Sequence, residues 1–195
     1  MGIDKVFRIL MLEDLQDDVG LIERTLRKEG MNFHSKRVDS QDEFTECLSS
    51  FQPDVILSDH ALPQFNSLEA LKICRSVAAH VPFILVTGTV SEEFAVQSMK
   101  AGAGDYILKD RLKRLPSSIN SALEKSRLEQ ERMSYMSEVI SQASLMREAE
   151  HLANFGSWQV DLVTGKHQWS DEAFRIFGFK PGEIEPDYEK FFRFV

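Results

Sequence analysis

The sequence predicts an α/β fold in which a doubly wound, five-stranded parallel sheet is covered by helices. Two observations predict it. Through about residue 110, short apolar segments alternate with amphipathic helical segments, which is the order expected of parallel strands joined by crossover helices. Three of the five apolar segments are nearly continuous, as strands covered on both faces should be.

The first strand and the first helix are expected at 6–12 and 17–29. The strand segment, VFRILML, is apolar at all but one position. The helical segment has apolar residues three or four positions apart and is followed by a helix-ending glycine, Gly30. Its expected buried face consists of Val19, Ile22 and Leu26.

A less apolar strand is expected at 33–38. Ser40 and Glu43 then have the spacing of a capping box, in which two side chains satisfy the free N–H groups of a helix start, so a helix is expected from this point. The next apolar run begins at Val55 and ends at Asp59, which predicts the third strand.

The remaining elements follow at similar spacing. We expect a helix at about 67–77, a strand at 83–87, a helix at about 92–101 and a strand at 106–108. In an open sheet of this kind, the functional crevice lies beyond the carboxyl ends of the strands. The residues that follow each strand are therefore the candidates for a site.

Polar residues stand at four of those strand ends. Glu13 and Asp14 follow the first strand and Asp59 follows the third. These strands are neighbours in a doubly wound sheet, so the three carboxylates should meet, and their repulsion calls for a cation. Oxygen ligands favour Mg²⁺. Thr87 and Lys109 end the fourth and fifth strands at the same edge.

This set of side chains suits transfer of a phosphoryl group to a carboxylate. Asp59 would be the nucleophile and phosphoacceptor, and Mg²⁺ would be held by Asp59 with Glu13 and Asp14. Lys109 and Thr87 would bind the phosphoryl oxygens. Each of these residues is common at strand ends, so the prediction depends on the whole set.

Four segments carry a resemblance to a known family: the acid pair at 13–14, LSDHALP, VTGT and MKAGAGDYILKD. Over about residues 5–125 the chain resembles the receiver (CheY-like) domains of two-component response regulators, so we expect a receiver domain at 1–125. The resemblance implies a flavodoxin-like sheet in the order 2-1-3-4-5. It also implies reversible phosphorylation of Asp59 by a sensor histidine kinase or a histidine phosphotransfer protein.

The resemblance assigns further roles. The metal ligands that it implies are the side chains of Asp14 and Asp59 and the backbone carbonyl of Ala61, with Glu13 in support. Tyr106 would change rotamer when Thr87 moves toward the phosphoryl group. One departure from the family is Asp110, which follows Lys109 where a proline is usual, often after a cis bond. The geometry around this lysine is therefore open.

A long helical segment follows the alternating series. Pro116 can begin a helix, and no glycine or proline interrupts residues 117–155. Apolar residues recur with the spacing of a coiled coil, although Ser126 and Glu129 interrupt it. We expect a coiled-coil-like linker at 126–150 that pairs two copies of the chain. The alternative is a helix packed on its own domain at first and solvated later.

Residues 151–195 change pattern again. Two short alternating segments flank a Thr164-Gly165 turn, Ser170 has the position of a helix cap, and Pro181-Gly182 is expected to end that helix. The segment HLANFGSWQVDLVTGKHQWSDEAFRIFG resembles the start of a PAS domain of the kind common in bacterial sensor and hybrid histidine kinases. We expect a truncated PAS domain here.

Composition excludes several classes of protein. No apolar run is long enough for a bilayer and no export signal is present, so we expect a cytoplasmic chain without membrane contact. A net charge of −8 argues against nucleic-acid binding. Cys47 and Cys74 lack the spacing of a metal site or a disulfide framework.

Two other functions stay open: a flavodoxin-like phosphatase or phosphotransferase, and a degenerate receiver that only binds a partner. The first lacks a separate general base beside Asp59, because His60 is expected on a loop. The second does not need the complete set of acids, threonine and lysine. No phosphorylatable-histidine motif or ATP-binding glycine box is present, so any kinase activity would belong to the full-length parent.

Overall fold

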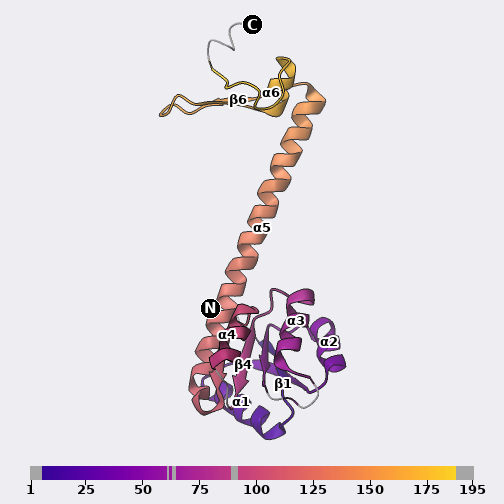
Figure 1. Ribbon diagram of the computed structural model, residues 1–195, viewed down its shortest axis with the longest axis vertical. Coiled ribbons are helices and arrows are strands. Elements are labelled where there is room, and N and C mark those ends of the chain that lie inside the picture. The colour runs from indigo at the N-terminus through magenta and orange to yellow at the C-terminus, as the bar shows by residue number, and fades with distance from the viewer. Residues whose placement is uncertain (1–5, 61, 63–64, 89–91, 188–195) are drawn as a thin grey trace. The chain divides into compact units, whose positions relative to one another are not determined.

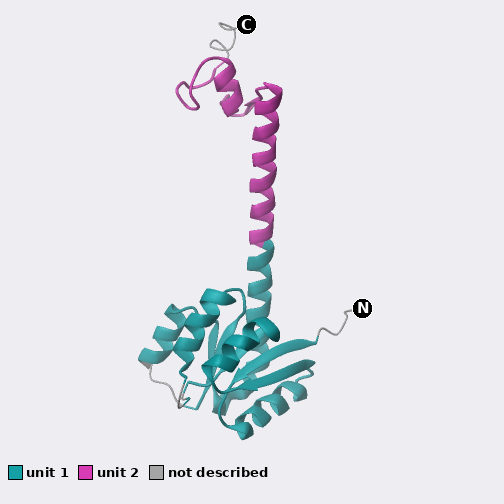
Figure 2. Ribbon diagram, turned by 90° about the vertical axis from the view of Figure 1, so that its right-hand side faces the viewer, with its two compact units in different colours: residues 1–131 teal, residues 132–195 magenta. Residues whose placement is uncertain are grey.

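The structure is a computed structural model of the chain, and it divides into two compact units, residues 1–131 and 132–195 (Figure 2). The residues that it describes are 6–60, 62, 65–88 and 92–187. None of the helices in these ranges combines the length and the apolar character that a bilayer-spanning helix needs.

Unit 1 contains a five-stranded parallel sheet in the order β2-β1-β3-β4-β5 (Figure 1). The strands are β1 (Phe7–Leu12), β2 (Phe33–Val38), β3 (Val55–Ser58), β4 (Phe83–Thr87) and β5 (Asp105–Leu108). The predicted doubly wound sheet and its 2-1-3-4-5 order are confirmed. The first residue of each strand is within one position of the predicted one.

The helices of unit 1 also begin close to the predicted positions. They are α1 (Gln16–Lys28), α2 (Gln41–Ser50), α3 (Ser67–Val77), α4 (Glu92–Lys100), the short 3₁₀ helix η1 (Lys109–Arg114) and the start of α5 (Leu115–Ala153). The Ser40 hydroxyl accepts a hydrogen bond from the Glu43 N–H at 3.4 Å, which is half of the expected capping box. Gly30, with φ of 77°, ends the turn after α1 in a conformation that favours glycine.

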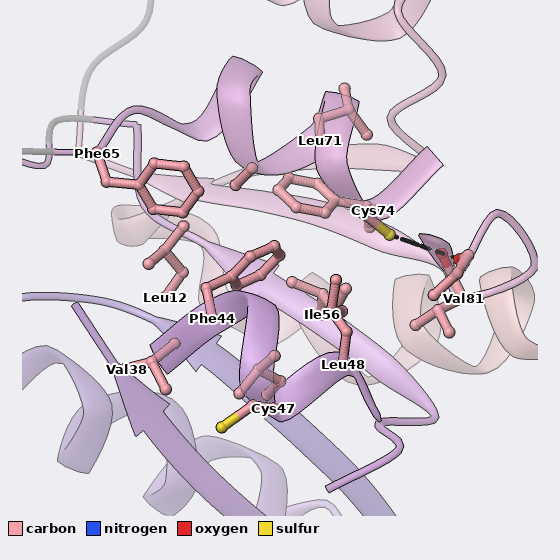
Figure 3. Close-up of a cluster of buried hydrophobic side chains, with 14 of the residues drawn as sticks. Leu12, Val38, Phe44, Cys47, Leu48, Ile56, Phe65, Leu71, Cys74 and Val81 are labelled. Carbon is pink, nitrogen blue, oxygen red and sulfur yellow. Dashed lines mark hydrogen bonds between the residues drawn. The ribbon is translucent and has the colours of Figure 1, made fainter. Parts of the chain in front are cut away.

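The sheet is buried on both faces because alternate residues of each strand point to opposite sides. Leu10, Ile56 and Phe83 face a cluster built with α2 and α3, which Figure 3 shows around Phe44 and Phe65. The rings of Phe44 and Phe65 lie 5.6 Å apart. On the opposite face, a second cluster is formed with α1 and α5 by Ile9, Met11, Val55, Leu57, Ile84, Val86 and Ile107. These two clusters fix the strands that carry the site.

The helix α5 has two different environments along its length. Leu115 and Ile119 are fully buried in the second cluster of unit 1. Beyond residue 131, apolar side chains are exposed, including Met133 at 69% and Ile140 at 62%. Within one chain, α5 therefore follows the alternative of a helix that is packed first and solvated later. Pairing of two copies stays a prediction.

Unit 2 contains a small antiparallel hairpin and a short helix. They are β6 (Trp158–Val160), β7 (His167–Trp169) and α6 (Asp171–Ile176). Ser170 caps α6 by accepting a hydrogen bond from the Ala173 N–H at 3.2 Å, as the sequence predicts. The Trp169 ring packs against Phe174 and Phe177, at centroid distances of 5.5 and 4.9 Å.

The expected end of this helix at Pro181-Gly182 is wrong. The helix α6 ends at Ile176, and Gly178, with φ of 84°, takes the left-handed conformation just beyond it. The Phe179 N–H then donates to the Phe174 carbonyl at 2.8 Å, which satisfies an end carbonyl of the helix. Gly178 supplied the stop before the proline was reached.

Candidate functional site at the carboxyl edge of the sheet

Three carboxylates meet at the carboxyl edge of the unit 1 sheet, the edge where its strands end. Leu12 of β1 pairs with Ser58 of β3, so the residues that follow them leave adjacent strands side by side. One carboxylate oxygen from each of Glu13, Asp14 and Asp59 lies within 4.8 Å of the other two. Glu13 and Asp59 are buried, and Asp14 is half-buried. The predicted convergence of the three acids is thus present.

Backbone hydrogen bonds hold the acids in place. The Asp59 N–H donates to the Leu12 carbonyl at 2.9 Å, which extends the β1–β3 ladder by one residue. The Asp59 Oδ1 accepts from the His60 N–H at 2.5 Å, and the Glu13 Oε1 accepts from the Leu15 N–H at 3.2 Å. The carboxylates of Asp59 and Glu13 therefore each have one oxygen bound by the loop that carries the residue.

The ammonium group of Lys109 lies among these acids. Its Nζ donates to Asp59 Oδ2 at 2.6 Å, to Glu13 Oε2 at 2.9 Å and to Asp18 Oδ2 at 2.5 Å. Lys109 begins η1 directly after β5, and no peptide bond among the described residues is cis. The ordinary trans backbone at Lys109-Asp110 therefore delivers the lysine to the predicted edge.

Burial and hydrogen bonding in the site alter two pKa values. Burial raises the pKa of Glu13 above its ordinary value, and hydrogen bonds from Lys109 and Leu15 oppose this only in part. Burial alone would lower the pKa of Lys109, but hydrogen bonds to Asp18, Asp59 and Glu13 outweigh it and raise that pKa. The lysine is thus held in its charged form.

Two residues of the site were not predicted from the sequence. Asp18, in the first turn of α1, is the third carboxylate on Lys109. Arg37, the last residue but one of β2, donates to the backbone carbonyls of Glu13 and Asp14 at 3.0 and 3.1 Å. For Asp18 a signal was available, because a second acid pair, Asp17-Asp18, follows the first pair after four positions in the sequence. Arg37 has no such signal.

The other predicted site residues occupy different positions. Thr87 is buried at the end of β4 and pairs with Leu108, the residue before Lys109, so it belongs to the same edge. Tyr106 lies on β5 and is 41% exposed. Ala61 lies outside the described residues, so the structure does not describe its backbone carbonyl.

The ring of His60 contacts residues outside the group of three acids. The ring packs against Phe94 of α4 with centroids 3.6 Å apart, and its Nδ1 lies 3.5 Å from the Ser67 hydroxyl. These contacts occupy the imidazole between α3 and α4.

Curated proteins resemble the first part of this chain in sequence. The regulatory protein AtoC of Escherichia coli (strain K12) is 28% identical over 102 residues, which are 52% of this chain and 22% of that protein. The methanogenesis regulatory protein FilR1 of Methanothrix harundinacea (strain 6Ac) is 30% identical over 122 residues, 60% of this chain and 27% of that protein. The chain spans less than half of the length of these relatives.

Solved structures resemble unit 1 in fold. A receiver domain protein (CheY-like) from Methanospirillum hungatei JF-1 has a TM-score of 0.56 at 25% identity, over 64% of this chain and 99% of that one. The receiver domain of a LuxO repressor protein from Vibrio parahaemolyticus has a TM-score of 0.58 at 22% identity, over 65% of this chain and 96% of that one. The second likeness shows a shared fold.

A family model identifies the group to which these relatives point. The model of the response regulator receiver domain matches residues 9–120, which is more than half of the chain, and the segment after 125 lies outside the match. The match includes the three acids of the sheet edge and Lys109. This chain therefore belongs to the response regulator receiver domain family.

Proposed function

We propose that unit 1 is the phosphoryl-accepting module of a two-component phosphorelay, with Asp59 as the acceptor. The observation that carries the proposal is the contact between Asp59 Oδ2 and Lys109 Nζ, 2.6 Å long, at the end of a fully buried strand. A nucleophilic carboxylate next to a fixed ammonium group can accept an anionic phosphoryl group without facing its full charge repulsion.

In the proposed reaction, a carboxylate oxygen of Asp59 attacks the phosphorus atom of a partner's phosphohistidine. The new O–P bond forms as the P–N bond breaks, and the imidazole leaves with the electron pair of that bond. Lys109 then contacts the phosphoryl oxygens, and the Thr87 hydroxyl donates a hydrogen bond to one of them. The partner would be a sensor histidine kinase or a histidine phosphotransfer protein.

The donor set of the site fits Mg²⁺. Glu13, Asp14 and Asp59 offer three carboxylate oxygens within 4.8 Å of one another, and hard dications prefer oxygen ligands. We propose these three as protein ligands, together with the carbonyl of Ala61. When bound, the ion would neutralise charge on the attacking carboxylate and on the incoming phosphoryl oxygens.

We propose that phosphorylation is transmitted through Thr87 and Tyr106. Thr87 would move toward the new phosphoryl group, and Tyr106, now 41% exposed, would turn inward into the space released. Tyr106 lies opposite Leu85, two residues before Thr87, so the two side chains stand on adjacent strands. Burial of the Tyr106 side chain would change the surface at β5, and a partner would recognise this change.

The part of the chain after residue 125 would carry the output. We propose that residues 126–150 pair two copies as a coiled coil and that 151–195 begin a PAS domain. The exposed apolar residues of α5 support the first proposal, and the hairpin β6–β7 followed by capped α6 supports the second.

Labelling with acetyl phosphate and Mg²⁺ tests the central proposal. Intact-protein mass spectrometry should find one added phosphoryl group on the wild type and none on Asp59→Asn. Asp17→Asn, which changes an exposed carboxylate of the same edge, is the matched control and should be labelled like the wild type. Equal labelling of wild type and Asp59→Asn would contradict the assignment.

This labelling, together with an assay of phosphate-ester hydrolysis, separates the two rival functions. A phosphatase would hydrolyse a small phosphate ester over many turnovers, whereas the proposed receiver would release at most the group it has accepted. A degenerate receiver would remain unlabelled under every condition. The His60 ring packs on Phe94, and this contact favours the receiver over a phosphatase that would use His60 as its general base.

A further inference from the structure

Asp18 differs from the other acids around Lys109 in one respect. Glu13 and Asp59 each contact the lysine and also belong to the group of three carboxylates that can hold a metal ion. Asp18 contacts the lysine at 2.5 Å but is not a member of that group. Its side chain is 27% exposed, compared with 3% for Glu13 and 9% for Asp59.

The lysine and a dication compete for the same two carboxylates. An ammonium group has three N–H donors, and in this structure three carboxylates accept from Lys109. A dication bound by Glu13 and Asp59 would draw these oxygens away and repel the lysine. Of the three carboxylates that accept from Lys109, only Asp18 would then remain in contact with it. Its attraction therefore matters more with the ion bound than without it.

We infer that Asp18 is a positioning residue of the proposed phosphoryl-transfer site, which holds the Lys109 ammonium at the edge when a dication takes over Glu13 and Asp59. This inference rests on the proposed function, which supplies the Mg²⁺ ion that Glu13 and Asp59 would bind. The location of Asp18 suits the role, since the first turn of α1 is where the helix dipole favours a carboxylate. The anchor keeps the lysine close to the oxygens that an arriving phosphoryl group would bring.

The matched control is one residue away. Asp17 carries the same charge on the same helical turn, but it is exposed and no contact with Lys109 is present. Asp18→Asn and Asp17→Asn thus remove equal charge from one turn of α1. If the two substitutions change Mg²⁺ affinity by different amounts, the difference measures the contact of Asp18 with the lysine. The change that both produce measures the loss of a nearby negative charge.

Isothermal titration of the metal-free full chain with Mg²⁺ tests the inference. Asp18→Asn should weaken Mg²⁺ binding about fivefold, while Asp17→Asn should change it less than about twofold. Asp18→Glu, which keeps the carboxylate, should restore most of the affinity. In a Lys109→Gln background the effect of Asp18→Asn should fall to that of Asp17→Asn, because the lysine to be anchored is gone. Circular dichroism checks that each variant is folded.

Equal effects of Asp18→Asn and Asp17→Asn would overturn the inference. So would an effect of Asp18→Asn that persists unchanged without Lys109. The proposed function fails separately: a wild type that shows the coupling but takes no label on Asp59 would refute phosphoryl transfer and leave the anchor in place. A wild type that is labelled on Asp59, in a chain where Asp18→Asn has no Lys109-dependent effect on Mg²⁺ binding, would support phosphoryl transfer and refute the anchor.

Discussion

The Nζ of Lys109 and the Oδ2 of Asp59 lie 2.6 Å apart, although 50 positions separate the two residues in the chain. The contact arises because β3 and β5 flank β4 in a parallel sheet and end at the same edge. It joins the proposed acceptor to the residue that neutralises it. The consequences of this arrangement for stability and for assembly can be measured.

Replacing Lys109 with alanine should destabilise unit 1 by about 2 kcal/mol, because three carboxylates lose their shared cation. The pKa of Lys109 is raised on folding, so its contribution is fully present below the ordinary lysine pKa and is lost only as pH rises through the higher folded value. Urea denaturation at pH 6 and pH 8 should therefore show the same loss. Lys72→Ala, an exposed lysine of α3, is the control. A loss confined to pH 6 would refute this.

Glu13→Gln should raise the melting temperature of the metal-free protein by a few degrees at pH 7 and leave it nearly unchanged at pH 4. The pKa of Glu13 is raised on folding, mainly by burial, so the folded state retains its proton longer and stability falls as pH rises through that window. Glutamine removes this loss. Thermal unfolding in the presence of a chelator measures it.

The control for this experiment is Glu29→Gln, at an exposed site after α1, which should change neither melting temperature. Mg²⁺ should stabilise Glu13→Gln less than the wild type, because one proposed ligand is lost. Greater destabilisation of Glu13→Gln at pH 7 than at pH 4 would show that the sign of the effect is wrong.

Gly156→Ala should disturb unit 2 by about 1–3 kcal/mol. A methyl group at Gly156 would lie 2.5 Å from the Cα of Ala173, a backbone atom that cannot move without shifting α6. The two tryptophans of the chain, Trp158 and Trp169, both lie in the hairpin of unit 2, so a red shift of fluorescence would report the change.

Gly20→Ala serves as the matched glycine substitution. Apart from the chain neighbours and the nearby backbone of α1, no described atom lies within 4 Å of the added methyl group. Gly20 is inside α1, so alanine should stabilise unit 1 by about 1 kcal/mol without altering tryptophan emission. A Gly156→Ala protein with unchanged emission and unchanged melting would show that the close approach to Ala173 is easily relieved.

Removing the chain after Glu131 should convert a dimer into a monomer. Apart from Leu128, the large exposed apolar residues of α5 lie beyond this point, whereas Leu115 and Ile119 are buried in unit 1 and have to be retained. Light scattering coupled to size exclusion measures the mass. Ile140→Glu should weaken the dimer and Ser141→Glu, at an exposed neighbouring position, should not. A full chain that is monomeric at high concentration would exclude pairing through α5.

The sequence alone determined most of the fold of unit 1. Continuous apolar runs and helical periodicity depend on local residue order, so β4 and α3 were predicted at their observed bounds. The same local signals failed at the end of α6, where Gly178 offered a left-handed stop that was less conspicuous than Pro181-Gly182. Strand ends also predicted which acids would gather, because parallel strands bring their carboxyl ends to one edge.

Only the tertiary structure decided which of these charges touch. The contact of Lys109 with Asp18 and the hold of Arg37 on the loop after β1 depend on side-chain reach across elements that are distant in sequence. These distances cannot be predicted from residue order, because they depend on how α1 packs on the sheet and how β2 pairs within it. The sequence determined that acids and a lysine would meet at this edge. The packed structure decided that Lys109 also contacts Asp18, which lies outside the group of three acids.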